Sequence, residues 1–266
     1  DYEYDNTDKD KSAIVNILNK KKIIYQLPLF NKKYVVFFDL LLSKICDMIF
    51  NSMTKDKKFI GAELLHSLII YIIGKGDAEM DQSLIYLLRK ILYLACDLEK
   101  GISKIFETLL FQLIHWISKD AKSNKNILQM LDIIIECTSN RKNLKLREIS
   151  SECLSEYIKW FIKQNIHHKG VKEKLHTLKY LIRKIESNSL HPDSFKRFGA
   201  ILCFEKILDH IAKSPILADK FLLEIFYYII STIKICHTNA DLNEFIYKHG
   251  QNSINIIITG IKNNFD

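Results

Sequence analysis

The side chains whose types and spacing could do chemistry are mainly basic. Between residues 171 and 186, four basic side chains follow one another at steps of four, three and four: Lys172, His176, Lys179 and Arg183. On an α-helix these steps place all four on one stripe, while the apolar residues of the segment line another. The pattern predicts a surface that contacts backbone phosphates, with an affinity that falls steeply as salt rises. The alternative is the solvated outer face of a helix.

Two more cations follow a corner marked by Pro192, in the sequence LHPDSFKRFGA. Lys196 and Arg197 stand at the start of the next apolar helical pattern. Both are candidates for phosphate contacts. A basic residue at the start of a HEAT-type helix also serves packing and local ion pairing, so both interpretations stay open for this pair.

The local sequence motifs of catalysis and metal binding are missing. The chain has no GxSxG elbow, HExxH helix, paired-carboxylate motif or P-loop, and it lacks the protein-kinase motifs HRD and DFG. Its six cysteines lie far apart without a CxxC pair, which predicts free thiols in a reducing compartment. We therefore expect no catalytic residue, cofactor or metal in this segment.

The charge balance is compatible with a polyanionic partner. The 266 residues include 39 Lys+Arg and 31 Asp+Glu, which gives a formal net charge of +8. Lysines spread along solvated helix faces explain the same excess. The longest apolar run without charge, residues 67–74, is far shorter than the roughly 20 residues that a membrane span needs, so no membrane partner is expected.

The elements that must position these residues are predicted to be helices. Only 8 Gly and 3 Pro occur, and 48% of the residues are hydrophobic, in long runs with a helical period. We expect an all-α fold of about ten helices. Residues 1–30 are predicted to be an acidic linker, cut from a longer chain, with a short amphipathic helix over 12–22. Residues 31–266 are predicted to be one helical-repeat segment. The expected helices cover 34–53, 58–73, 82–97, 102–119, 127–138, 144–168, 171–187, 194–212, 216–237 and 242–262.

Self-similarity indicates how these helices pack. The helix starts KFIGAELLHSLI, KIFETLLFQLIHWI, LREISSECLSEYI and FKRFGAILCFEKIL recur at steps of 45, 44 and 49 residues. Three of them carry a small residue at the matching position, Ala62, Ser151 or Ala200, which lets neighbouring helices approach closely. The period is that of HEAT or armadillo units, so the prediction is an α-solenoid of HEAT-like helical hairpins.

Several blocks, in one order, resemble a known family. They are VVFFDLLLSKI at 35–45, GAELLHSLIIYIIGK at 61–75, LLRKILYLACDLEKGISKIFETLLFQLIHW at 87–116, YIKWFIKQ at 157–164 and LHPDSFKRFGAILCFEKI at 190–207. They are similar to the DNA-dependent protein kinase catalytic subunits, among the phosphatidylinositol 3-kinase-related kinases. The similarity extends over about residues 33–241.

This resemblance implies a non-catalytic scaffold segment, a part of the helical cradle that receives double-strand DNA ends together with the Ku heterodimer in non-homologous end joining. It implies a nuclear protein whose serine/threonine kinase domain lies elsewhere in the parent chain, so no catalytic residue carries over. Neighbouring helical repeats of the same chain are the further expected partners. The alternative is a HEAT-type protein–protein adaptor with no DNA role.

Overall fold

A computed structural model describes residues 22–27, 32–75, 81–119, 124–165, 171–236 and 240–265. The chain divides into two units, Asp1–Leu87 and Leu88–Asp266. Ten α-helices and one β-hairpin make up the described part. The all-α fold class is therefore confirmed, with the hairpin as an unpredicted addition. The short helix expected over 12–22 falls almost entirely outside the described residues, and Lys22 itself begins a strand.

The β-hairpin in the first unit differs from the sequence prediction at two places: the end of the expected linker and the start of the first long helix. Strand β1 (Lys22–Leu27) pairs antiparallel with β2 (Lys32–Phe37), in a register that sets Lys22 opposite Phe37. Residues 22–27 were expected to belong to a linker, and residues 34–37 to a helix. The sequence of β2 is KKYVVF, whose β-branched and aromatic side chains suit a pleated strand. The following helix begins only at Phe38.

Two helices of the first unit pack on each other. They are α2 (Phe38–Asn51) and α3 (Lys55–Lys75). Gly61 of α3 lies at their crossing, because a Cβ there would meet Met48 Cε at 2.8 Å and Ile49 Cγ1 at 2.9 Å. Ala62, the small residue of the repeat pattern, is fully buried beside it. Small side chains thus allow the two helices to approach closely.

Helix α4 (Asp81–Ala95) runs across the division between the units, and the remaining helices belong to the second unit. Their bounds are α5 (Lys100–Lys119), α6 (Asn124–Thr138), α7 (Leu144–Asn165), α8 (Val171–Ser189), α9 (Ser194–Ala212), α10 (Pro215–Ile235) and α11 (Ala240–Phe265). Each lies within three residues of the bounds predicted from the sequence.

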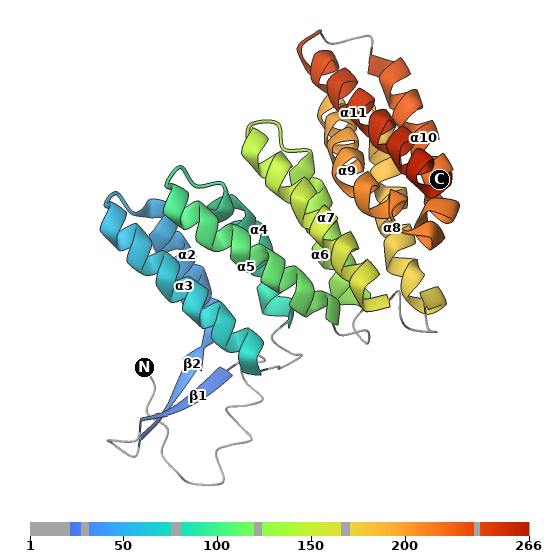
Figure 1. Cartoon of the computed structure of the whole chain (residues 1–266). Coiled ribbons are helices and arrows are strands. Elements are labelled where there is room, and N and C mark those ends of the chain that lie inside the picture. Colours follow the sequence, from blue (N-terminus) through green and yellow to red (C-terminus); the bar gives the residue numbers. More distant parts are fainter. Residues whose placement is uncertain are drawn as a thin grey trace. The chain divides into compact units, whose positions relative to one another are not determined.

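Within the second unit, two rows of helices form the α-solenoid arrangement that was predicted (Figure 1). In one row α7 packs on α5, α9 on α7, and α11 on α9. In the other row α8 packs between α6 and α10, and α8 and α10 also contact α9. Helix α9 is therefore covered on most sides, and the small residues Ser151 of α7 and Ala200 of α9 are buried.

The turn before α9 is closed by polar contacts. Asp193 is the N-cap, and its side chain accepts a hydrogen bond from the Phe195 N–H at 2.9 Å. Such a cap satisfies a backbone donor that the first turn of a helix leaves free. Pro192 stands just before the cap, as the sequence predicted. Six residues after the cap, a Cβ at Gly199 would lie 2.5 Å from the carbonyl oxygen of Thr138, so α9 touches the end of α6 there.

Candidate functional site

The predicted basic stripe lies on the exposed side of α8. His176, Lys179 and Arg183 are all exposed, and they line a surface pocket of about 510 Å³. Lys172 is in the first turn of the same helix. The helical steps of three and four residues thus bring at least three of the predicted basic residues together, as the sequence predicted.

Tyr180, Lys184 and Ser187 complete the lining of this pocket. The Tyr180 hydroxyl donates to Asp132 Oδ1 of α6 at 2.7 Å, and Lys184 Nζ lies 3.5 Å from the same oxygen. Lys184 Nζ also stands 5.3 Å from the centre of the Tyr180 ring. The hydrogen bond with Tyr180, aided by the carboxylate of Asp132, raises the pKa of Lys184. The ammonium group of Lys184 is thus fixed at one place on the pocket wall and stays charged.

The pocket is suited to a multiply charged anion. Lysine and arginine side chains converge on it, one carboxylate faces them from α6, and Lys184 already neutralises that carboxylate. Lys179 forms no ion pair with a described residue, so its ammonium group can meet a phosphate without first breaking a contact. The side chains approach from one helix face, which suits contact with a sugar–phosphate backbone and offers no geometry for reading bases.

Glu186 is a buried residue of α8, one turn after Arg183. It is only 4% exposed, and its Oε1 has no hydrogen-bond partner in the described structure. Burial, and then the charge of Glu224 on α10, raises the pKa of Glu186 to about 7, while Arg183 acts in the opposite direction. Glu186 is three residues after Arg183 and seven after Lys179, so this buried carboxyl group lies at the edge of the cationic pocket on the same helix.

Lys196 and Arg197 do not line the α8 pocket, and both lie in the first turn of α9. Arg197 is only 4% exposed, and its Nη1 donates to the carbonyl oxygens of His191 at 2.8 Å and Pro192 at 2.7 Å. Lys196 is half-buried, with its Nζ 3.3 Å from His191 Nε2. Of the two interpretations for this pair, the packing role is therefore the one that holds for Arg197. Its side chain stabilises the turn before α9 and does not reach the surface.

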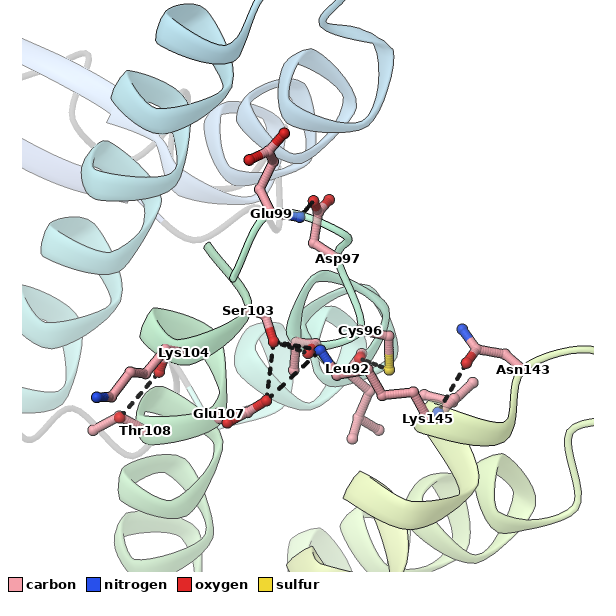
Figure 2. Close-up of polar contacts among 12 residues, drawn as sticks. Leu92, Cys96, Asp97, Glu99, Ser103, Lys104, Glu107, Thr108, Asn143 and Lys145 are labelled. Atoms are coloured by element: carbon pink, nitrogen blue, oxygen red, sulfur yellow. Dashed lines mark hydrogen bonds and ion pairs between the residues drawn. The ribbon is translucent and has the colours of Figure 1, made fainter. Parts of the chain in front are cut away.

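A second polar cluster joins α4, α5 and α7 (Figure 2). Lys145 Nζ donates to Ser103 Oγ at 2.6 Å and lies 3.9 Å from Glu107 Oε1. Ser103 Oγ in turn is 2.8 Å from the carbonyl oxygen of Ala95 and 2.9 Å from Glu107 Oε1. A serine beside a lysine can be a nucleophile, but Ser103 is 3% exposed and the lysine donates to it instead of accepting its proton. The cluster therefore has a structural role: its hydrogen bonds hold α4, α5 and α7 together.

The cysteines offer no reactive thiol in this part of the chain. None of the six forms a disulfide bond, and five of them are buried. Burial raises the pKa of Cys96 to about 12 and that of Cys137 to about 11, so these thiols stay protonated. Within the described ranges, no group of three His, Cys, Asp or Glu side chains could hold a metal ion. None of the described helices has the length and apolar character needed to cross a membrane.

Sequence reasoning missed part of the pocket wall. Tyr180, Lys184 and Ser187 continue from His176 at steps of four, four and three, so helical spacing alone would have found them. The contact with Asp132 could not be predicted from the sequence. Asp132 lies on α6, 48 residues before Tyr180, and only tertiary packing brings the two together.

The helical hairpins and the cationic pocket define the chain as an α-solenoid segment with a surface suited to anions. A family model described as "DNA-dependent protein kinase catalytic subunit, CC1/2" matches residues 79–243. The chain belongs to this family. The matched region is the helical CC1/2 region, which is not the kinase domain.

Curated relatives agree with the family match. The DNA-dependent protein kinase catalytic subunits of Gallus gallus and Canis lupus familiaris are each 28% identical to this chain over 230 residues, which is 83% of the chain. The chain spans only 6% of the length of either relative. Among solved structures, computationally designed armadillo repeat proteins for modular peptide recognition align over 81% of this chain and 99% of theirs, at 14% identity and a TM-score of 0.26.

Proposed function

We propose that this segment is a non-catalytic helical-repeat scaffold within a DNA-dependent protein kinase catalytic subunit. In this role it forms part of the cradle that receives double-strand DNA ends together with the Ku heterodimer, in non-homologous end joining in the nucleus. The observation that carries the proposal is the CC1/2 family match over residues 79–243. The serine/threonine kinase activity then belongs to another part of the parent polypeptide.

The proposed mechanism is geometric and electrostatic. Helix α8 is held between α6 and α10 and so presents His176, Lys179 and Arg183 at fixed spacing, with Lys184 beside them. Lys179, Arg183 and Lys184 neutralise backbone phosphates and release counterions without reading bases. Lys172 would extend the stripe by one turn, and Lys196 would add a separate contact. Arg197 does not belong to the proposed contact surface, because it is buried.

Binding of a duplex DNA fragment by the 266-residue chain tests the proposal. The double variant Lys179→Gln/Arg183→Gln should weaken binding. Since each phosphate contact contributes about −0.9 to the slope of log K against log salt, losing two should make the slope shallower by about 2. The matched control is Lys104→Gln/Lys248→Gln, which removes the same charge from exposed positions on α5 and α11.

Circular dichroism should show that both variants keep the helical content of the parent. If both double variants lose affinity equally, binding depends on net charge and the α8 surface has no special part in it. If the parent binds duplex no better at low salt than at high salt, the DNA role fails. A HEAT-type protein–protein adaptor then becomes the better description.

A further inference from the structure

A serine of the α8 pocket carries an exposed hydroxyl group. Ser187 lines the pocket, and its Oγ forms no hydrogen bond with a described residue. Ser189 lies only two residues later but is fully buried, and its Oγ donates to the carbonyl oxygen of Glu186 at 2.7 Å. A modifying enzyme can therefore reach the hydroxyl group of Ser187, whereas that of Ser189 is covered and already bonded.

Two cations stand one helical turn before this hydroxyl group. Arg183 and Lys184 precede Ser187 by four and three residues, and helix residues at these separations are neighbours, with Cβ atoms about 5–6 Å apart. All three side chains line the same pocket. Lys184 Nζ lies 3.5 Å from Asp132 Oδ1 of α6, which fixes its place, while Arg183 is exposed and forms no ion pair with a described residue. A phosphate on Ser187 Oγ would therefore meet a guanidinium and an ammonium group on its own helix.

The sequence before Ser187 is suited to recognition by a kinase. It reads RKIES, with basic residues four and three positions before the serine. Serine/threonine kinases that select basic substrates bind such residues with acidic side chains, which is a form of charge complementarity. Ser187 is the third residue from the end of α8, where the last carbonyl groups of a helix lack intrahelical partners. Few hydrogen bonds therefore have to open before the segment can enter a kinase cleft.

We infer that Ser187 is a phosphorylation site for a basic-directed serine/threonine kinase, and that its phosphate occupies the α8 pocket. In the transfer, a bond forms between Ser187 Oγ and the γ-phosphorus of ATP, and the bond from that phosphorus to the bridging oxygen breaks. ADP leaves, and the hydroxyl proton passes to the catalytic aspartate of the kinase.

The phosphate is held by the cations of the pocket. It carries about 1.5 to 2 negative charges at neutral pH and three acceptor oxygens, which suit charge-assisted hydrogen bonds with Arg183 and Lys184. The dipole of α8 disfavours negative charge near the C-terminal end of the helix, so these two contacts decide where the phosphate lies. Once in place, it neutralises the side chains that the proposed function assigns to DNA phosphates. That effect on DNA rests on the proposed function, whereas the modification and the contacts with the two cations do not.

Incubation of the 266-residue chain with ATP and the catalytic domain of protein kinase C, a basic-directed kinase, tests the modification. Mass spectrometry should find phosphate on Ser187 and none on Ser189. Lys184→Gln should slow the labelling of Ser187 by about tenfold, because it removes a basic residue that the kinase binds. Lys248→Gln, at an exposed position of α11, is the control and should leave the rate unchanged. A synthetic peptide of residues 180–190 should be labelled as well. Label on the peptide alone would show that the folded chain closes the site, and label on neither would show that the sequence is not recognised; both results overturn the inference.

A second measurement follows the phosphate itself, in a chain that carries genetically encoded phosphoserine at position 187. The second pKa of phosphoserine is about 6, and two neighbouring cations should lower it by about 1 unit in a phosphorus NMR titration. Arg183→Gln/Lys184→Gln should restore the ordinary pKa of the phosphate, while Lys104→Gln/Lys248→Gln should leave the lowered pKa in place. The same phosphate pKa with and without Arg183 and Lys184 would overturn the inference.

Duplex binding by the same phosphorylated chain separates this inference from the proposed function. Phosphorylation should make the slope of log K against log salt shallower by about 2, because the neutralised cations no longer release counterions from DNA. If the phosphate pKa is lowered by the two cations but the slope and the affinity stay unchanged, the phosphate contact stands and the α8 pocket is not a DNA site.

Discussion

Arg183 and Arg197 both come from basic stretches of the sequence, but one lies on the surface and the other is buried in the first turn of α9. Arg183 is exposed on α8 and lines the cationic pocket. Arg197 is buried, and its guanidinium binds the carbonyl oxygens of His191 and Pro192. A planar group with several donors satisfies backbone acceptors in a turn as readily as it binds a phosphate. The count of basic residues in a segment therefore overstates its binding surface.

Glu186 is a buried residue whose ionisation affects the stability of the fold. Burial, and then the charge of Glu224, raises its pKa from an ordinary value of 4.5 to about 7. Because the folded-state pKa lies above the unfolded one, the neutral carboxyl is the form that the fold tolerates. Its contribution to stability is fully present below about pH 4.5 and is lost as the pH rises through about 7.

Glu186→Gln should therefore stabilise the protein at neutral and higher pH. An amide keeps the shape of the side chain and cannot ionise, so we expect a gain on the order of 1–3 kcal/mol at pH 8. The gain should shrink toward zero as the pH falls below 4.5, because Glu186 then becomes neutral in the unfolded state as well. Urea unfolding of the two proteins across this range measures the difference. Glu63→Gln, at an exposed position of α3, is the control, and a constant difference at all pH values would contradict the assignment.

At the scale of elements, the crossing of α9 with the end of α6 depends on one missing side chain. A Cβ at Gly199 would lie 2.5 Å from the Thr138 carbonyl oxygen and 2.9 Å from its carbonyl carbon. These are backbone atoms, which cannot turn aside as a flexible side chain can. Thr138 also closes the last turn of α6, where its Oγ1 donates to the carbonyl oxygen of Ile135 at 2.7 Å.

Gly199→Ala should destabilise the protein although alanine is the better helix former. Helix propensity alone would favour alanine by about 1 kcal/mol. The clash with Thr138 should reverse that sign and leave a net loss of about 1–3 kcal/mol, the usual effect of overpacking. Thermal unfolding measures the change. Gly101→Ala, at an exposed position of α5, is the control and should leave stability unchanged or raise it. Similar behaviour of the two variants would mean that α6 and α9 can move apart at no cost.

Helix α9 and strand β2 show which elements local sequence predicts. The bounds of α9 match the prediction at both ends, because Pro192 and Asp193 mark its start and Ser214 and Pro215 begin the next helix. The sequence predicts helix for residues 34–37 of β2, since the helical spacing of apolar residues in α2 extends back to Phe37. Its pairing with β1 is a contact between separate segments, and helical periodicity carries no information about it.

At the scale of the molecule, the order of the helices and the length of the repeat can be predicted from the sequence. Both depend on the spacing of apolar residues and on the residues that begin and end each helix, which are local properties of the chain. The cationic stripe on α8 follows for the same reason. The burial of Arg197 and the pairing of Lys184 with Asp132 do not, because both depend on how one hairpin meets the next. The family match over residues 79–243 gives these surfaces their proposed context.

The protonated thiols also make the molecule convenient for site-specific chemistry. Burial raises the pKa of Cys96, Cys137, Cys153, Cys203 and Cys236, and Cys46 is fully buried. Alkylating reagents attack thiolates, so the native cysteines should react slowly. A cysteine placed beside the α8 pocket would carry a fluorophore selectively, with no need to remove the native ones, and would report on ligand approach in real time.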